Sequence, residues 1–156
     1  MQVDELVMSP HAFLKGMREQ HLRSLSEVAM RANFAEGEWI FREGERADRF
    51  YLIEEGSVII TSRMPTNSQI VIQTLGPGDA VGWAWLIEPY MWYFDARADE
   101  ATCTLSFNAV RLREQCKEDP KLSFELMKRV THVLIDCLQG TRLSLLDAYA
   151  ARGIEM

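Results

Sequence analysis

One short stretch of the chain is crowded with aromatic side chains. Its six aromatic residues are Trp83, Trp85, Tyr90, Trp92, Tyr93 and Phe94. Ligand sites are mostly apolar with a few polar anchors, so the stretch is suited to an aromatic pocket for a planar or apolar ligand. The same rings could instead fill an internal cavity, because protein interiors do not leave large voids. The residues alone leave both interpretations open.

The sequence gives little support for a nucleotide phosphate loop, a metal site or a catalytic group. The run Gly76-Pro77-Gly78-Asp79 lacks the Gly-Lys-Ser/Thr ending of a nucleotide phosphate loop, so we interpret it as a structural turn. A cupin-type metal site needs histidines on strands, but His11, His21 and His132 fall on expected helices. No Ser/His/Asp or Cys/His group occurs at local spacing. We therefore predict no catalytic residue, no metal site and no resident cofactor, and we predict that the protein is not an enzyme.

Composition narrows the possible partners. The 156 residues suit one domain, and 17 basic against 23 acidic residues give a net charge of -6. The basic stripe that would neutralise nucleic-acid phosphates is missing. No segment approaches the about 20 apolar residues of a membrane span, so we expect a cytoplasmic protein without membrane contact. The odd, widely spaced Cys103, Cys116 and Cys137 predict reduced thiols and no disulfide framework.

Hydrophobic periodicity divides the single expected domain, residues 1–156, into three parts. Apolar residues at near-helical spacing predict N-terminal helices over 11–31, and short β-branched and aromatic runs separated by turn residues predict strands over 32–108. Residues 109–150 return to a helical pattern. Pro120 is suited to open the last helix, because a first-turn residue needs no N–H.

The glycines of the central part follow a distinctive order. Gly37, Gly44 and Gly56 punctuate the run from Phe34 to Val58, and Leu75-Gly76-Pro77-Gly78-Asp79-Ala80-Val81-Gly82 follows. This pattern resembles the cyclic-nucleotide-binding domain family, from about His11 to Tyr149. The resemblance implies an α+β fold: an antiparallel β-roll of the jelly-roll type, flanked by N-terminal helices and a long C-terminal helix.

The resemblance also places a ligand-binding segment, the phosphate-binding cassette. In the family a Gly-Glu-Leu triplet opens a short helix whose N–H groups face the phosphate. The Glu holds the ribose hydroxyl, and an arginine further on pairs with the cyclic phosphate. Here Gly82 matches the glycine, but Trp83, Ala84 and Trp85 follow it, and Trp92 stands near the arginine position. These five residues are the candidate ligand-binding residues.

The departure from the family pattern shapes the functional prediction. No basic residue lies between Val81 and Asp95, and Arg97 matches a later strand position, where we expect Asp95 or Asp99 to orient it. We predict a non-enzymatic small-molecule sensor or regulatory domain with a divergent, aromatic-rich cassette, whose ligand is a cyclic nucleotide or another small molecule. The alternative is a degenerate fold that serves as a protein-interaction or dimerisation scaffold without ligand. An open cavity beside Gly82 favours the first, and tryptophans inside it favour the second.

The apolar pattern of the C-terminal helix predicts contact with a second copy of the chain. Val130, Leu134, Cys137 and Thr141 fall near heptad spacing and form an expected homodimer seam. DNA-binding relatives carry a helix-turn-helix after this helix, whereas the chain ends at Met156. We therefore expect no direct contact with nucleic acid, and output through an effector protein.

Overall fold

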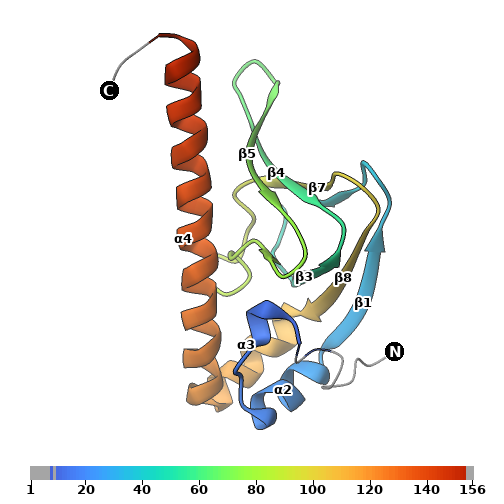
Figure 1. Ribbon diagram of the computed structural model, residues 1–156. Coiled ribbons are helices and arrows are strands. Elements are labelled where there is room, and N and C mark those ends of the chain that lie inside the picture. Colours follow the sequence, from blue (N-terminus) through green and yellow to red (C-terminus); the bar gives the residue numbers. More distant parts are fainter. Residues whose placement is uncertain (1–7, 9, 154–156) are drawn as a thin grey trace.

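Along the chain, two antiparallel sheets are preceded by short helical segments and followed by two helices. In Figure 1 the first helices before and after the sheets lie together at one end of the sheets, and the last helix runs along their side. The computed structural model describes Met8 and residues 10–153. The strands within these residues are β1 (Ala29–Phe34), β2 (Trp39–Phe41), β3 (Arg49–Glu55), β4 (Val58–Arg63), β5 (Gln69–Leu75), β6 (Ala80–Val81), β7 (Asp95–Ala98) and β8 (Thr102–Asn108). The predicted α+β fold with an antiparallel roll is confirmed.

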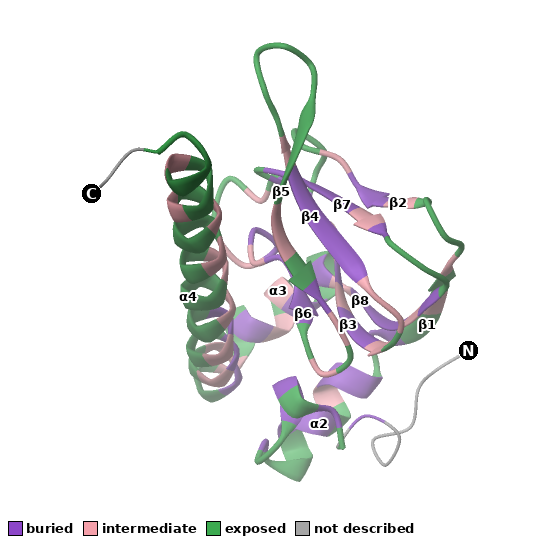
Figure 2. Ribbon diagram, turned by 45° about the horizontal axis from the view of Figure 1, so that its top comes forward, coloured by how far each residue is buried: buried purple, intermediate pink, exposed green. Residues whose placement is uncertain are grey.

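The sheets place the middle of the chain around one core. The first has the order β1-β8-β3-β6 and the second β2-β7-β4-β5. Apolar side chains on their inner faces are buried, as Leu52 and Leu105 show where they pair across β3 and β8. Figure 2 shows this burial along β3, β4 and β8. The fixed inward face sets the strand register, because a slip of one residue would turn the apolar set outward.

The N-terminal segment is less helical than its periodicity predicts. A 3-10 turn, η1 (Ala12–Leu14), and a helix, α2 (Glu19–Ser26), precede the roll. Residues 29–31, expected to be helical, instead begin β1. They pair with residues 105–107 of β8. This pairing with a strand far along the chain decides their conformation, although their local spacing is typical of a helix.

Two helices follow the roll. The Asn108 side chain accepts a hydrogen bond from the Arg111 amide and caps α3 (Ala109–Glu118). Asp119 caps α4 (Pro120–Ala151) through the Leu122 amide, and Pro120 opens the helix as predicted. At about 1.5 Å per residue the 32 residues of α4 extend for about 48 Å.

The two halves of α4 have different surroundings (Figure 1). Its buried residues, Leu122, Leu126 and Val130, all lie in the first half and pack into the core. The second half runs beside β5, an edge strand of the second sheet. There the Ser144 hydroxyl donates to the carbonyl oxygens of Ile72, at 3.2 Å, and Val71, at 3.4 Å. The helix thus encloses one side of the roll.

Candidate functional site

A cavity of about 220 Å³ lies beside Gly82, between the second sheet, the residues around β6 and α4. Residues from all three parts line it: Ile60, Gln73, Thr74, Leu75, Asp79, Ala80, Gly82, Trp83, Phe94, Val133, Asp136 and Cys137. The cavity therefore joins the predicted cassette to the C-terminal helix.

Gly82 is required by its backbone and by its neighbour. Its φ is +82°, which side chains other than glycine rarely adopt, and a Cβ there would collide with the Trp92 ring. That ring is stacked on Phe41, with 3.8 Å between centroids and 5° between planes, and is 3% exposed. Trp92 therefore fills the core next to Gly82 and does not line the cavity.

Ala84 and Trp85 also belong to the core. Trp85 is 1% exposed and stacks on Phe50, with 3.9 Å between ring centroids. Of the five candidate ligand-binding residues, Gly82 and Trp83 line the cavity, whereas Ala84, Trp85 and Trp92 do not. This placement has a packing reason, because stacking inside the roll removes most of the surface of large flat rings from water.

Trp83 forms part of the cavity wall towards α4. Its ring lies over Tyr93, with 5.2 Å between centroids, and its side chain contacts the Cys137 thiol. Burial raises the pKa of Cys137, while hydrogen bonds from Trp83 and Thr141 partly oppose the rise. The Cys137 thiol therefore serves as a neutral wall of the cavity.

The cassette segment does not form the short helix found in the family. Residues 83–89 make successive turns, in which the Leu86 amide donates to the Trp83 carbonyl and the Ile87 amide to the Ala84 carbonyl, both at 3.3 Å. A phosphate cradle uses helix N–H groups and a cation. No Lys or Arg is among the described residues lining the cavity. The site thus lacks both parts of that cradle.

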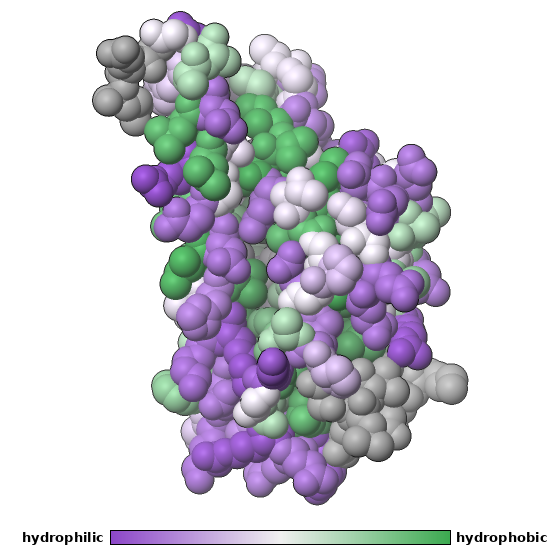
Figure 3. Space-filling view, viewed as in Figure 1, coloured by the Kyte–Doolittle hydropathy of each residue, from purple (hydrophilic) through white to green (hydrophobic). Residues whose placement is uncertain are grey.

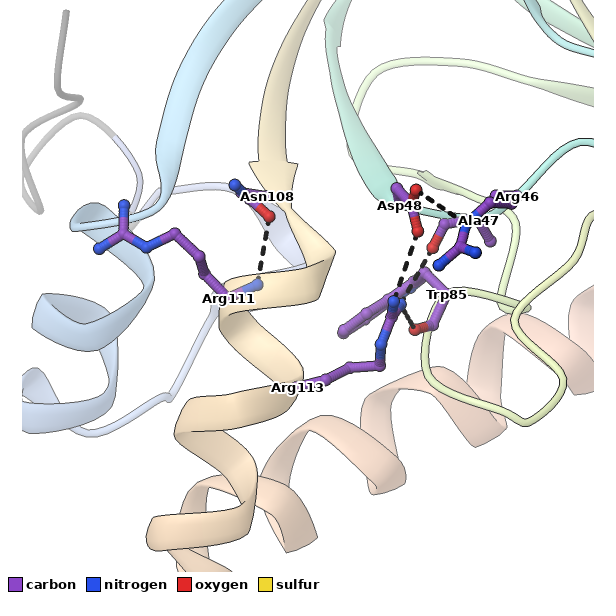
Figure 4. Close-up of polar contacts among 7 residues, drawn as sticks. All are labelled: Arg46, Ala47, Asp48, Trp85, Asn108, Arg111 and Arg113. Atoms are coloured by element: carbon purple, nitrogen blue, oxygen red, sulfur yellow. Dashed lines mark hydrogen bonds and ion pairs between the residues drawn. The ribbon is translucent and has the colours of Figure 1, made fainter.

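Arg113 on α3 fixes the segment from the opposite side (Figure 4). Its guanidinium donates to the carbonyl oxygens of Trp85, at 2.6 Å, and Ala47, at 3.0 Å. It also lies 3.5 Å from the Asp48 carboxylate and 4.0 Å from the centroid of the Tyr90 ring. One side chain thereby connects the cassette, the start of β3 and the C-terminal helices.

Arg97 lies on β7 as predicted, but its expected partner is wrong. Its guanidinium lies 5.3 Å from the Trp39 ring centroid. The buried Asp95 carboxylate instead accepts from the Glu43 amide at 2.7 Å and lies 3.4 Å from the Arg42 guanidinium. Asp95 and Arg97 are two positions apart on β7 and so share a face of the strand, but Glu43 and Arg42 already engage the Asp95 carboxylate, and Arg97 lies over Trp39 instead.

Two of the three histidines, His11 and His21, have structural partners. The His11 ring caps η1 by accepting from the Phe13 amide, and its Nε2 lies 2.9 Å from the Ile53 carbonyl oxygen. Burial lowers the pKa of His11, and the Ile53 carbonyl opposes this shift. His21 is buried 3.7 Å from the Asp119 carboxylate. Within the described residues no group of three or more His, Cys, Asp or Glu could hold a metal ion.

The four expected seam residues divide between two surroundings. Val130 is buried in the core of this chain, and Cys137 lines the cavity. These two positions differ from the expected seam, because the roll already covers them. Leu134 and Thr141 are exposed. Figure 3 shows hydrophobic side chains gathered along the upper part of α4. Over the whole length of α4, the large apolar residues that are exposed are Phe124, Met127, Leu134, Ile135, Leu138, Leu143 and Leu145.

Sequence reasoning missed several residues of the site. Gln73 and Thr74 on β5, shortly before the cassette, and Asp136 on α4, far beyond it in sequence, also line the cavity. Asp136 precedes Cys137, which the heptad spacing assigns to a partner-facing surface, and no local pattern shows that α4 turns this part towards the roll. Arg113 carried no signal, because an arginine on an amphipathic helix is ordinarily solvated.

The fold and this cavity define a class of protein. The chain belongs to the cyclic nucleotide-binding domain family, whose model matches residues 31–119. Domains of this family are regulatory sensors. In the described part of the chain, no helix combines the length and apolar character needed to cross a membrane.

Individual relatives include regulators of two kinds. The chain is 27% identical over 150 residues to the CRP-like cAMP-activated global transcriptional regulator of Mycobacterium tuberculosis, covering 93% of this chain and 62% of the relative. It therefore spans about three fifths of that curated relative's length. It is 37% identical over 62 residues to the cAMP-dependent protein kinase regulatory subunit of Dictyostelium discoideum, covering 38% and 19% of the two chains.

Solved structures agree with the fold. A candidate cyclic nucleotide-binding protein from Geobacter metallireducens GS-15 has a TM-score of 0.78 and 25% identity, covering 87% of this chain and 98% of that one. The regulatory subunit of a cAMP-independent protein kinase A from Trypanosoma brucei has a TM-score of 0.65 and 25% identity, covering 78% and 43%.

Proposed function

We propose that this protein is a non-enzymatic regulatory module that senses a small molecule in the cavity beside Gly82. The observation that carries the proposal is the cavity itself, which is open while Trp85 and Trp92 lie outside it in the core. A ligand there would touch both the roll and α4, through Val133, Asp136 and Cys137. A ligand that binds more tightly when α4 is in one position would increase the population of that position.

Cyclic AMP in the family's usual pose does not fit this site well. No cation lines the described cavity, the cassette forms turns, and Trp92 stands near the arginine position. Losing one buried charge partner costs about 2–5 kcal/mol. We expect a dissociation constant for cyclic AMP weaker than micromolar. Regulation without cyclic AMP has a parallel in the structurally similar Trypanosoma brucei subunit, described as belonging to a cAMP-independent kinase.

The test begins with native mass spectrometry of the purified protein, to identify any retained small molecule. That compound, cyclic AMP and cyclic GMP are then titrated in a thermal-shift assay. A ligand at 100 times its dissociation constant stabilises the folded state by about 2.7 kcal/mol. For a domain of this size the melting temperature should rise by about 5–11 °C.

Two variants of α4 locate the binding site. Val133→Trp adds a large ring where Val133 lines the cavity, and it should abolish the ligand-induced shift. Lys128→Trp adds the same ring on α4 at a side chain that is 55% exposed and does not line the cavity, so it should keep the shift. A shift that survives Val133→Trp would place the ligand elsewhere. Micromolar binding of cyclic AMP would contradict the expected selectivity.

We further propose a homodimer formed through the exposed apolar residues of α4, centred on Leu134. Leu134 is 38% exposed and Leu138 63% exposed, and water contact with such side chains favours association. Leu134→Asp would place a charge in the interface at a cost of several kcal/mol. Light scattering should report a dimer for the unaltered protein and a monomer for the variant.

Lys121→Asp is the matched control for the dimer. Lys121 is exposed near the start of the same helix, where an acidic residue suits the helix dipole. It should leave the dimer intact. A monomeric unaltered protein at high micromolar concentration would refute this contact. A dimer broken by Leu134→Asp, together with no ligand from any assay, would favour the alternative of a ligand-free interaction scaffold.

A further inference from the structure

The polar groups of the cavity carry negative charge. Two of its lining residues are Asp79, at the turn before β6, and Asp136, on α4. Its remaining polar lining comes from Gln73 and Thr74, which are neutral, while Ile60 and other apolar residues form the inner wall. No Lys, Arg or His lines the cavity within the described part of the chain. The cavity is therefore electronegative.

The two carboxylates differ in what holds them. Asp79 accepts a hydrogen bond from the Gly76 amide at 2.9 Å, which fixes its side chain in the turn. Asp136 is exposed, and among the described residues no hydrogen bond or ion pair engages its carboxylate. It can therefore bind a ligand without first breaking an internal contact. A carboxylate is an acceptor only, so its natural partner is a donor or a cation.

Two basic side chains line an adjoining hollow of about 250 Å³. This hollow shares Asp79 and Asp136 with the cavity and adds Arg129 and His132. The Arg129 guanidinium lies 3.3 Å from the Glu125 carboxylate and donates to the Lys15 carbonyl, so its charge is balanced there. Arg129 consequently offers an anion in the cavity little compensation for the two aspartates.

We infer that the cavity beside Gly82 selects a small organic cation and rejects anions of similar size. This inference rests on the proposed sensor function and assigns a ligand class to its site. An aromatic wall such as Trp83 adds attraction for a cation. The volume of about 220 Å³ lies below the about 300–1,000 Å³ of sites for drug-sized ligands, which indicates a small ligand.

Three probes of one shape test the charge selection: benzamidinium, benzamide and benzoate, which are positive, neutral and negative at neutral pH. Dissociation constants are measured on the full chain by isothermal titration calorimetry at low ionic strength, where screening is weak. A unit charge about 4 Å from another in water changes affinity about fivefold. Benzamidinium should bind at least about fivefold more tightly than benzamide and still more tightly than benzoate.

Two isosteric variants assign the preference to one carboxylate. Asp136→Asn should reduce the preference for benzamidinium over benzamide by at least about twofold, since it removes one of the two negative charges at the cavity and leaves only Asp79. Asp147→Asn removes a charge from the same helix at an exposed position that does not line the cavity, and it should keep the preference. Nuclear magnetic resonance of the tryptophan indole N–H groups reports whether a probe reaches Trp83.

Each contrary result is informative. Tighter binding of benzoate than of benzamidinium, or displacement of benzamidinium from Trp83 by micromolar cyclic AMP, would overturn the ligand class while leaving a sensor at this site. A preference unchanged by Asp136→Asn would also overturn the class. No binding by any probe would overturn it too, and the retained-ligand measurement described above would then decide separately whether the sensor function fails.

Discussion

Replacing Arg113 with methionine should loosen the connection between the cassette and the C-terminal helices. Methionine keeps an apolar stem of similar length but removes the guanidinium, which donates to Trp85 at 2.6 Å and to Ala47 at 3.0 Å. A hydrogen bond from a charged group contributes about 1.5–3 kcal/mol, and the stacking on Tyr90 about 0.5–1 kcal/mol. Because the Arg113 side chain is 12% exposed, water compensates for part of the lost interactions. We therefore expect the free energy of unfolding to fall by about 2–3 kcal/mol.

Urea denaturation gives the free energy of unfolding, and a loss of this size should also lower the melting temperature by about 4–12 °C. Arg111→Met is the matched control on the same helix, because the exposed Arg111 side chain points away from the cluster (Figure 4). Arg113→Lys keeps the charge without the planar fork and should lose an intermediate amount. A loss below about 1 kcal/mol for Arg113→Met, or an equal loss for Arg111→Met, would refute a clamping role.

Three further predictions concern single side chains. Trp92→Ala should lower the free energy of unfolding by about 3–5 kcal/mol, because it empties a buried stack, and Trp92→Phe should lose less in the same urea titration. Burial lowers the pKa of His11, so the unfolded chain takes up its proton first as the pH falls, and stability is lost below the ordinary pKa of about 6.5. His11→Gln should flatten that loss between about pH 7 and pH 5, and an unchanged pH profile would contradict it. Burial raises the pKa of Cys116 to about 11, so its thiol should react with a disulfide reagent at pH 8 far more slowly in the folded than in the urea-unfolded protein.

The order of glycines made the roll predictable, because tight turns constrain residue type strongly. Gly37, Gly44 and Gly56 all adopt positive φ values at turns between strands. Pro120 and Asn108 mark the starts of two helices through equally local rules. Residues 29–31 were assigned wrongly, because their strand is fixed by pairing with β8, about 75 residues further along.

The cavity was only partly predictable, because its lining also depends on contacts between residues that are far apart in the sequence. Gly82 and Trp83 follow from the family pattern, but whether Trp85 and Trp92 enter the cavity depends on the rings available for stacking, Phe50 and Phe41. Those contacts are tertiary and leave no local periodicity. The sequence did not predict which part of α4 faces the roll either. A helix with apolar residues on several sides gives no pattern that distinguishes the side packed on its own domain.

The course of α4 beside β5 has a consequence for the behaviour of the protein in concentrated solution. As an edge strand, β5 would present unpaired backbone groups, together with exposed Ile70 and Val71, to other molecules. Such edges recruit further strands and lead to aggregation unless they are covered. Ser144 occupies two of its carbonyl groups, and the helix around it blocks sideways approach. The second half of α4 thus prevents strands of other molecules from pairing with β5.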